Sequence, residues 1–281
     1  MPLAKLQPTD TRALFRPVAA ELLRVLKALP PSEWERPTIA GSWLLRDVVA
    51  HLIDVAFRRL SFHRDRLIPP PPSRPINSER DFIDFINGIN AEWVNANRRL
   101  SPRILTDLLE KSTTELATHF ETLPFEAPAL FGVSWAGEQT SEGWFDVGRE
   151  FTELWHHQEQ IRLAIGAPPL ADARFLHAVL EIAVRGLPHA FRDTKAAEGD
   201  TVVLEVGGPA GGLWTLTRRE NRWELESGEP PRTTTRIRVS DKNAWRLLFN
   251  ALKGDTPRTV VEAEGQPELV AAFLAARSVV V

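Results

Sequence analysis

The sequence lacks two residue types that carry much of enzyme chemistry: its 281 residues include no cysteine and no tyrosine. Without cysteine the chain forms no disulfide, offers no thiolate as a metal ligand and has no thiol nucleophile of its own. Without tyrosine it has no phenol to act as an acid or to activate a bound thiol. Any sulfur chemistry therefore requires a thiol supplied from solution.

Long apolar runs and an excess of one charge are also missing. No stretch approaches the ~20 apolar residues of a membrane span, and residues 1–8 lack the apolar core of a secretory signal, so we expect a cytoplasmic protein without a membrane span. The 34 basic and 37 acidic residues are interspersed and give a net charge of -3. This balance predicts no binding to nucleic acid or acidic lipid.

The first part of the chain has apolar residues at helical spacing. The predicted helices cover residues 10–28, 43–67, 78–99, 101–123 and 144–165. The proline-rich stretch 69–75 is expected to be a surface loop, and Gly166 followed by two prolines ends the last of these helices. Long helices joined by loops, with no strand signal, predict an antiparallel bundle over residues 1–167.

The remainder, residues 168–281, has a different pattern. A helix at 172–187 is followed by segments with a period of two, and then by helices from 241 and 266 with a short strand from 260 between them. The period-two segments are 201–206, 213–218, 222–226 and 236–239. This order predicts a smaller α+β domain with helices against one face of a mainly antiparallel sheet.

Glu153 and His157 are the first candidate site residues. They are four apart in a predicted helix, so their side chains lie one turn apart on one face. A carboxylate and an imidazole in this arrangement supply two ligands to a divalent metal if a third arrives from elsewhere. Glu and His also occur at this spacing on solvated faces, as a minor helix pair. His156 points about 100° away from His157 on an ideal helix and is not expected to be a ligand.

His51 is the candidate for the third ligand. It lies on the apolar stripe of another predicted helix, together with Leu44 and Val48. Burying an imidazole there is costly unless something bonds it, which leaves a metal ligand or a hydrogen-bonded core histidine. Asp47, one turn earlier, could orient His51 or form a surface pair with a cation such as Arg46.

The third predicted helix carries two further polar residues of interest. Asn87 and Asn90 lie beside its apolar face. They could line a cleft or simply be solvated.

These residues resemble a known family. Trp43, Arg46, Asp47 and His51 early in the chain, followed by Glu153 and His157 near the end of the helical part, resemble the thiol (mycothiol)-dependent maleylpyruvate isomerase family within the DinB/YfiT-like metal-binding superfamily. The resemblance covers nearly the whole chain in element order. It implies a DinB-like antiparallel four-helix bundle followed by a sterol-carrier-like α+β domain.

The family also implies a divalent metal held by two histidines and one glutamate, which map onto His51, Glu153 and His157. Zinc is the expected metal and nickel the alternative. Two features depart from the family pattern or leave it open. Gln160 stands where members often have an aspartate. The family also implies a substrate-binding arginine in the C-terminal domain, and residue spacing does not identify which arginine this is. The candidates for that arginine are Arg218, Arg219, Arg222 and Arg258.

Three function classes follow from this pattern. The first is a metal-dependent enzyme that acts on a small-molecule substrate and uses a low-molecular-weight thiol as cosubstrate, either a cis–trans isomerase or an S-transferase. The second is a metal-dependent hydrolase on the same bundle, because an open metal site can activate water as well as a thiol. The third is a non-enzymatic protein that binds metal or an apolar ligand.

Overall fold

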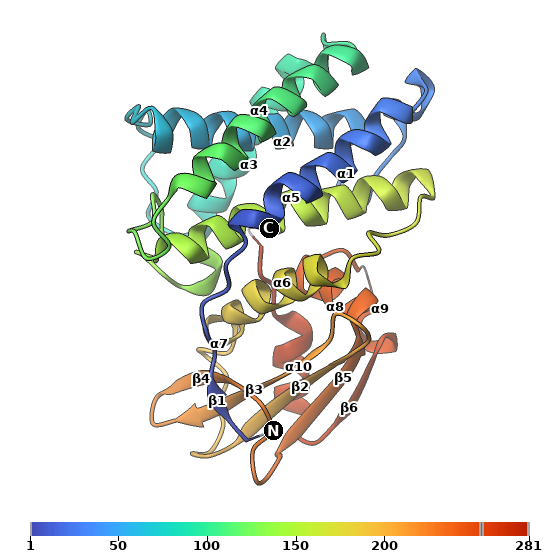
Figure 1. The fold of residues 1–281 in the computed structure, drawn as a ribbon. Coiled ribbons are helices and arrows are strands. Elements are labelled where there is room, and N and C mark those ends of the chain that lie inside the picture. The colour runs from blue at the N-terminus through green and yellow to red at the C-terminus, as the bar shows by residue number, and fades with distance from the viewer. Residues whose placement is uncertain (1, 253, 255, 280–281) are drawn as a thin grey trace. The chain divides into compact units, whose positions relative to one another are not determined.

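A computed structural model describes residues 2–252, 254 and 256–279 of the chain (Figure 1). The chain is mainly helical and contains a six-stranded sheet. It divides into two compact units. The helical unit comprises Asp10–Leu130 and Glu153–Ala171, and the sheet unit comprises Met1–Thr9, Phe131–Thr152 and Asp172–Val281.

The helices of the helical unit lie close to the predicted ranges. They are α1 (Phe15–Ala28), α2 (Leu45–Arg59), α3 (Glu79–Asn97), α4 (Pro102–Thr122) and the second half of α5 (Gly143–Ile165). Polar caps set two of the starts, because the hydroxyls of Ser78 and Ser101 accept hydrogen bonds from backbone N–H groups in the first turns of α3 and α4. Residues 69–75 are all exposed, as expected of a surface loop.

Two predicted helix ends are wrong. The first helix does not begin at Asp10: a short 3₁₀ turn at Arg12–Leu14 precedes α1, and the Asp10 carboxylate instead accepts hydrogen bonds from Arg12. The second helix does not extend to Leu67, because α2 passes into one π-helical turn at Leu60–Arg64 and ends there. Periodicity predicts that a helix exists better than it predicts where the helix ends, since the ends depend on local hydrogen bonds.

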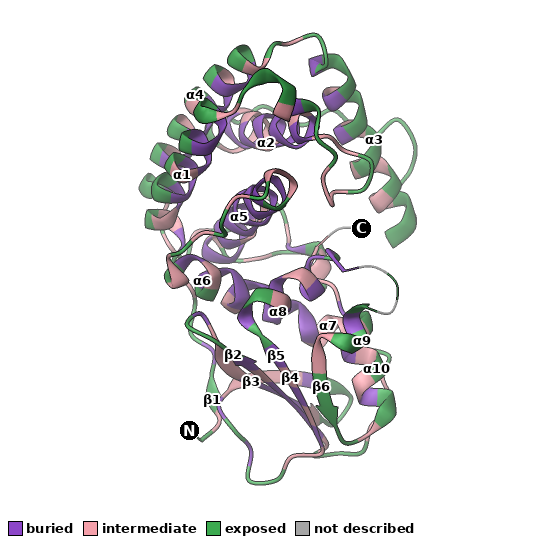
Figure 2. Ribbon diagram, turned by 90° about the vertical axis from the view of Figure 1, so that its right-hand side faces the viewer, coloured by how far each residue is buried: buried purple, intermediate pink, exposed green. Residues whose placement is uncertain are grey.

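The core of the helical unit lies between α1, α2 and α4. Figure 2 shows that the buried residues of each helix follow the side that faces the other helices. Phe15 of α1 and Phe120 of α4 are both buried and meet edge to face, with ring centroids 4.8 Å apart. Helix α3 is attached to α2 by the indole N–H of Trp93, which donates to the carbonyl of Ala50 at 2.8 Å. This contact holds α3 beside the middle of α2, where His51 lies.

The sheet unit contains the predicted strands and one more. The strand order is β1-β4-β3-β2-β5-β6, with β2 and β5 parallel and the other described pairs antiparallel. The strands are β1 (Ala4–Lys5), β2 (Thr201–Gly207), β3 (Gly212–Arg219), β4 (Arg222–Ser227), β5 (Thr235–Ser240) and β6 (Val261–Glu264). The predicted α+β class and mainly antiparallel sheet are therefore confirmed.

Short helices complete the sheet unit. They are α6 (Ala173–Ala183), α7 (Leu187–Ala190), α8 (Asp241–Leu248), α9 (Thr256–Thr259) and α10 (Pro267–Ala275), and α7, α8 and α10 contact the strands. The single helix predicted at 172–187 is broken after Ala183 by a 3₁₀ turn. Within the described residues, no helix is long and apolar enough to cross a membrane.

The two units differ from the predicted ranges 1–167 and 168–281. Residues 1–9 group with the sheet unit because β1 pairs with β4 and the Gln7 carbonyl accepts a hydrogen bond from Arg185. Residues 131–152 do so because Trp135 packs on Phe145 and closely approaches Gly186. Helix α5 thus contributes its first half to one unit and its second half to the other. Strand pairing and packing between distant segments leave no signal in local periodicity, so the sequence pattern could not predict this division.

Candidate metal centre

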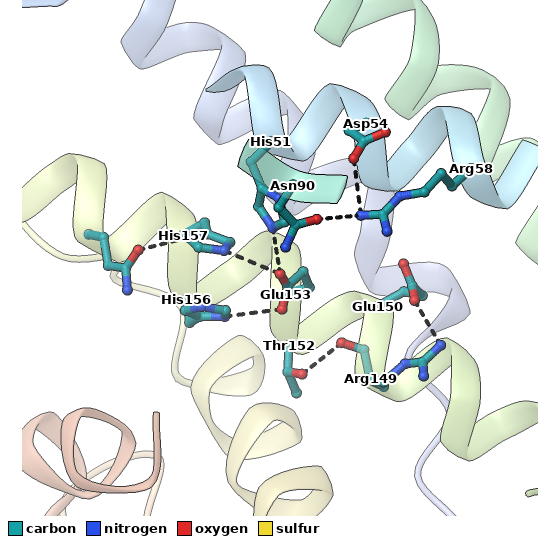
Figure 3. Close-up of polar contacts among 11 residues, drawn as sticks. His51, Asp54, Arg58, Asn90, Arg149, Glu150, Thr152, Glu153, His156 and His157 are labelled. Carbon is teal, nitrogen blue, oxygen red and sulfur yellow. Dashed lines mark hydrogen bonds and ion pairs between the residues drawn. The ribbon is translucent and has the colours of Figure 1, made fainter. Parts of the chain in front are cut away.

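The structure brings the three predicted ligands together inside the helical unit (Figure 3). His51 projects from the middle of α2, and Glu153 and His157 project from successive turns of α5. One donor atom from each residue lies within 4.8 Å of the other two. Among the described residues, this is the one group of three or more such side chains with converging donor atoms.

One oxygen of Glu153 lies at the centre of the cluster. Its Oε1 is 2.8 Å from Nε2 of His51 and 3.2 Å from Nε2 of His157. Two ligands of a tetrahedral zinc ion with bonds of about 2.0–2.1 Å are separated by roughly 3.3 Å. These two separations lie near that value and the third pair of donor atoms lies within 4.8 Å, so two imidazoles and one carboxylate converge on a space of the size that a divalent ion such as zinc needs.

Gln160 sets the orientation of the His157 ring. Its amide oxygen is 2.7 Å from Nδ1 of His157, while Nε2 faces Glu153. The amide oxygen favours the tautomer with the proton on Nδ1, which leaves the Nε2 lone pair for a metal ion. Both ring nitrogens of His157 therefore face oxygen atoms, although a neutral imidazole has only one N–H. A cation between Nε2 and the Glu153 carboxylate would satisfy both groups. The chain thus has an amide at the position where the family often has an aspartate, and the amide still contacts the ligand histidine.

His51 is oriented by packing. Its ring lies 4.9 Å from the Trp43 ring and 4.9 Å from the His157 ring, measured between centroids, and only 4% of the residue is exposed. Nδ1 of His51 has no hydrogen-bond partner among the described residues. Trp43, part of the motif that carried the family resemblance, therefore serves as one wall of the cluster.

Asp47 does not orient His51, so that hypothesis is wrong. The Asp47 carboxylate accepts a hydrogen bond from the backbone N–H of Leu44 at 3.1 Å and pairs with Arg98 at 3.2 Å. It thus closes the first turn of α2, where free N–H groups need acceptors. The alternative of an ion pair with a cation holds, with Arg98 in place of Arg46, but the Asp47 carboxylate is buried and the pair is not confined to the surface.

His156 is not part of the converging group, as expected. Its ring lies 4.0 Å from the His157 ring between centroids, and its Nδ1 is 3.9 Å from Oε2 of Glu153. The donor atoms that converge come only from His51, Glu153 and His157.

Burial and neighbouring charges favour the protonation states that a metal site requires. Burial lowers the pKa of His51, outweighing its hydrogen bond to Glu153, so the imidazole favours its neutral form. Burial alone would raise the pKa of Glu153, but the hydrogen bonds to His157 and His51 and the charges of His157 and His156 hold that pKa well below its ordinary value. An ionised carboxylate beside a neutral imidazole is a suitable pair of ligands for a divalent ion.

Arg58 and Asn90 are neighbours of this cluster (Figure 3). Arg58 follows His51 by seven residues on α2, and its guanidinium donates to Oδ1 of Asn90 on α3 at 3.0 Å. Of the two asparagines that could line a cleft or be solvated, Asn90 is buried beside the site and Asn87 is exposed. The sequence contained a signal that Arg58 lies near the site. Arg58 follows His51 by seven residues, which places it two turns later on the same helix face.

The four arginines considered for a substrate carboxylate all lie in the sheet unit. Arg219 and Arg222 pair with Glu224, the Arg218 guanidinium lies 6.0 Å from the centroid of the Trp223 ring, and Arg258 is exposed on α9. These contacts do not single out one of the four.

The pKa shifts predict that acid destabilises the metal-free protein. As the pH falls below 6.5, the ordinary pKa of histidine, His51 takes up its proton more readily in the unfolded chain than in the folded protein. Near pH 4.5 the same holds for Glu153, whose pKa is lowered on folding. Both shifts favour unfolding at low pH. The Tm measured in chelator should therefore fall as the pH is lowered from 7 to 4.

The variant His51→Gln supplies the control for this titration. Its Tm should fall less steeply between pH 6.5 and pH 5 than that of the wild type. A wild-type Tm that stays level or rises over this interval would contradict the assignment of a buried, neutral His51.

Gln160 should contribute to metal affinity through His157. In Gln160→Leu the buried Nδ1–H loses its acceptor, and we expect the metal dissociation constant to rise by about 10- to 100-fold, the usual effect of removing such a partner. Gln160→Glu keeps an acceptor oxygen at this position and should bind metal at least as tightly as the wild type. Competition with a chromophoric chelator measures both constants. Unchanged affinity in Gln160→Leu would show that the ring needs no such partner.

Comparison with known proteins points in the same direction as this geometry. A family model described as the mycothiol maleylpyruvate isomerase N-terminal domain matches residues 15–162, more than half of the chain and all of the candidate site. Two solved structures, of a mycothiol-dependent maleylpyruvate isomerase and of a point mutant of that enzyme, are similar in fold. Each has a TM-score of 0.55 and 14% sequence identity, with 92% of this chain and 93% of that chain covered. No curated protein matches the chain.

Proposed function

Because this chain belongs to the mycothiol maleylpyruvate isomerase family, we propose that it is a metal-dependent enzyme that uses a low-molecular-weight thiol as cosubstrate. The proposed reaction is cis–trans isomerisation of an unsaturated acid resembling maleylpyruvate, or transfer of the thiol to such an acid. The observation that carries the proposal is the convergence of His51, Glu153 and His157 inside the matched region. The proposed thiol is mycothiol, and the proposed metal is zinc, with nickel as the alternative.

The domain assignment is part of this proposal. We propose that α1, α2, α4 and α5 correspond to the antiparallel four-helix bundle of DinB-like proteins. The α+β part within 168–281 would correspond to the sterol-carrier-like domain. Placement of all three candidate ligands in the helical unit supports this assignment.

The candidate ligands have distinct tasks in this proposal. His51 and His157 would offer Nε2 lone pairs, and Glu153 would offer its negative charge. Three protein ligands are typical of a catalytic zinc site, which keeps a further position for a thiol or water. A divalent ion held there supplies one chemical effect, which is to lower the pKa of a bound thiol or water toward neutrality. Gln160 keeps His157 in the required tautomer, and Trp43 holds the plane of His51.

The isomerisation itself needs no sulfur from the protein. The thiolate adds to one carbon of the cis double bond, forming a C–S bond and moving the electron pair of the double bond toward the conjugated carbonyl. Rotation about the resulting single bond and return of the electron pair expel the thiolate and leave the trans acid. The thiol is regenerated unchanged, which agrees with a chain that has no cysteine. Assay of the metal-loaded protein with a cis-unsaturated acid, with and without added thiol, tests this function.

A further inference from the structure

Arg58 is a cation placed beside the candidate metal centre. Seven residues span two turns of α2, so Arg58 and His51 lie on the same side of the helix about 10 Å apart along its axis. Long side chains in helices lean toward the N-terminus, and Figure 3 shows the Arg58 guanidinium extending back toward His51 and Glu153.

The hydrogen bonds of Arg58 are concentrated on one nitrogen. Nη2 donates to Oδ1 of Asn90 at 3.0 Å and lies 3.2 Å from Oδ2 of Asp54. Asn90 and Asp54 are both buried, so they hold the guanidinium in place. The buried Nε of Arg58 has no hydrogen-bond partner among the described residues, while 28% of the side chain remains exposed. The side chain is therefore fixed in position, and its exposed part can be reached by a ligand.

The ion pair with Asp54 fixes the guanidinium and offsets part of its charge. A guanidinium near two metal-ligating histidines opposes the binding of a divalent cation, because like charges repel across a partly buried site. An anion bound between the two cations would offset that repulsion. Arginine binds carboxylates well, because its planar donors match the geometry of the two oxygens.

We propose that Arg58, held by Asn90 and Asp54, binds a carboxylate of the substrate beside the metal centre. The inference rests on the proposed function and specifies how the helical unit recognises an unsaturated acid. It assigns carboxylate recognition to a residue of the same helix as His51, in addition to any arginine of the sheet unit. It also gives Asn90 the task of positioning the guanidinium.

Maleate, a small cis-unsaturated dicarboxylate, is a suitable probe. Its binding to the full-length protein is measured by isothermal titration calorimetry, once after chelator treatment and once after zinc loading. We expect the wild type to bind maleate in both states, and Arg58→Gln to bind it at least tenfold more weakly in both. Arg58→Lys, which keeps the charge without the planar donors, should lie between them. Dimethyl maleate, which has no carboxylate, should bind no better to the wild type than to Arg58→Gln.

Arg64→Gln is the matched control. It also removes one partly exposed arginine, from the π-helical turn that follows α2, where Arg64 pairs with Asp65 and Glu115. It should bind maleate like the wild type. Circular dichroism and zinc content of each variant show whether folding and the metal centre are retained.

The proposal is overturned if folded Arg58→Gln binds maleate as tightly as the wild type, or if the wild type binds no maleate in either state. Failure of the proposed function has a different signature. If the protein bound no metal or showed no thiol-dependent turnover, the proposed function would fail. The chelator-treated wild type would still bind maleate, and Arg58→Gln would still lose that binding.

Discussion

Protein purified without a metal-binding affinity tag should contain close to one divalent ion per chain. Replacing His51, Glu153 or His157 by Ala should reduce this content to a small fraction, because each replacement leaves only two of three protein ligands. The loss of affinity should exceed the roughly 10- to 100-fold effect of removing an outer partner such as Gln160. Elemental analysis after dialysis against a defined zinc concentration measures the content directly.

His119→Ala is the control for this series. His119 belongs to the same helical unit but not to the converging group, so its replacement should leave metal content unchanged. Full occupancy in all three ligand variants would end the metal-centre hypothesis. Loss of metal in the His119 variant as well would indicate a general loss of structure, which circular dichroism would detect.

Turnover should depend completely on an added thiol. The chain has no cysteine that could replace the cosubstrate, so isomerisation of a cis-unsaturated acid should fall to the uncatalysed rate when thiol is omitted. With thiol present, His51→Ala should lower kcat/KM by at least about 10³-fold, equivalent to roughly 4 kcal/mol of transition-state stabilisation. Mycothiol, glutathione and bacillithiol should each be tried, since the thiol-binding residues are not among those assigned above.

The outcome of this assay separates the three function classes. Formation of the trans acid without incorporation of ¹⁸O from labelled water supports the isomerase, and a stable thioether product supports the S-transferase. Turnover that needs no thiol and incorporates ¹⁸O would favour the hydrolase. Lack of turnover with every thiol, in protein that retains metal or an apolar ligand, would favour a binding protein.

The candidate site could be predicted only in part from the sequence. His157 and Glu153 are four residues apart on one helix, and this spacing alone places them on one face. His51 is 102 residues from Glu153, and no local pattern brings the two together. The family resemblance selected His51, whereas the 2.8 Å contact between its Nε2 and Glu153 comes from the packing of α2 near α5. The fold also places the Asp47 carboxylate at the start of α2, so this carboxylate does not orient His51.

The sequence by itself determined the features that depend on neighbours along the chain: helices where apolar residues recur at three- and four-residue steps, strands where they alternate, and breaks at proline and glycine. It also determined that the protein supplies no thiol. Tertiary structure alone decided which segments share a core, the addition of β1 to the sheet, the approach of His51 to Glu153 and the contact of Arg58 with Asn90. The physical reason is that side-chain contacts and burial are made between residues distant in the chain, and their energies depend on three-dimensional packing that no local periodicity records.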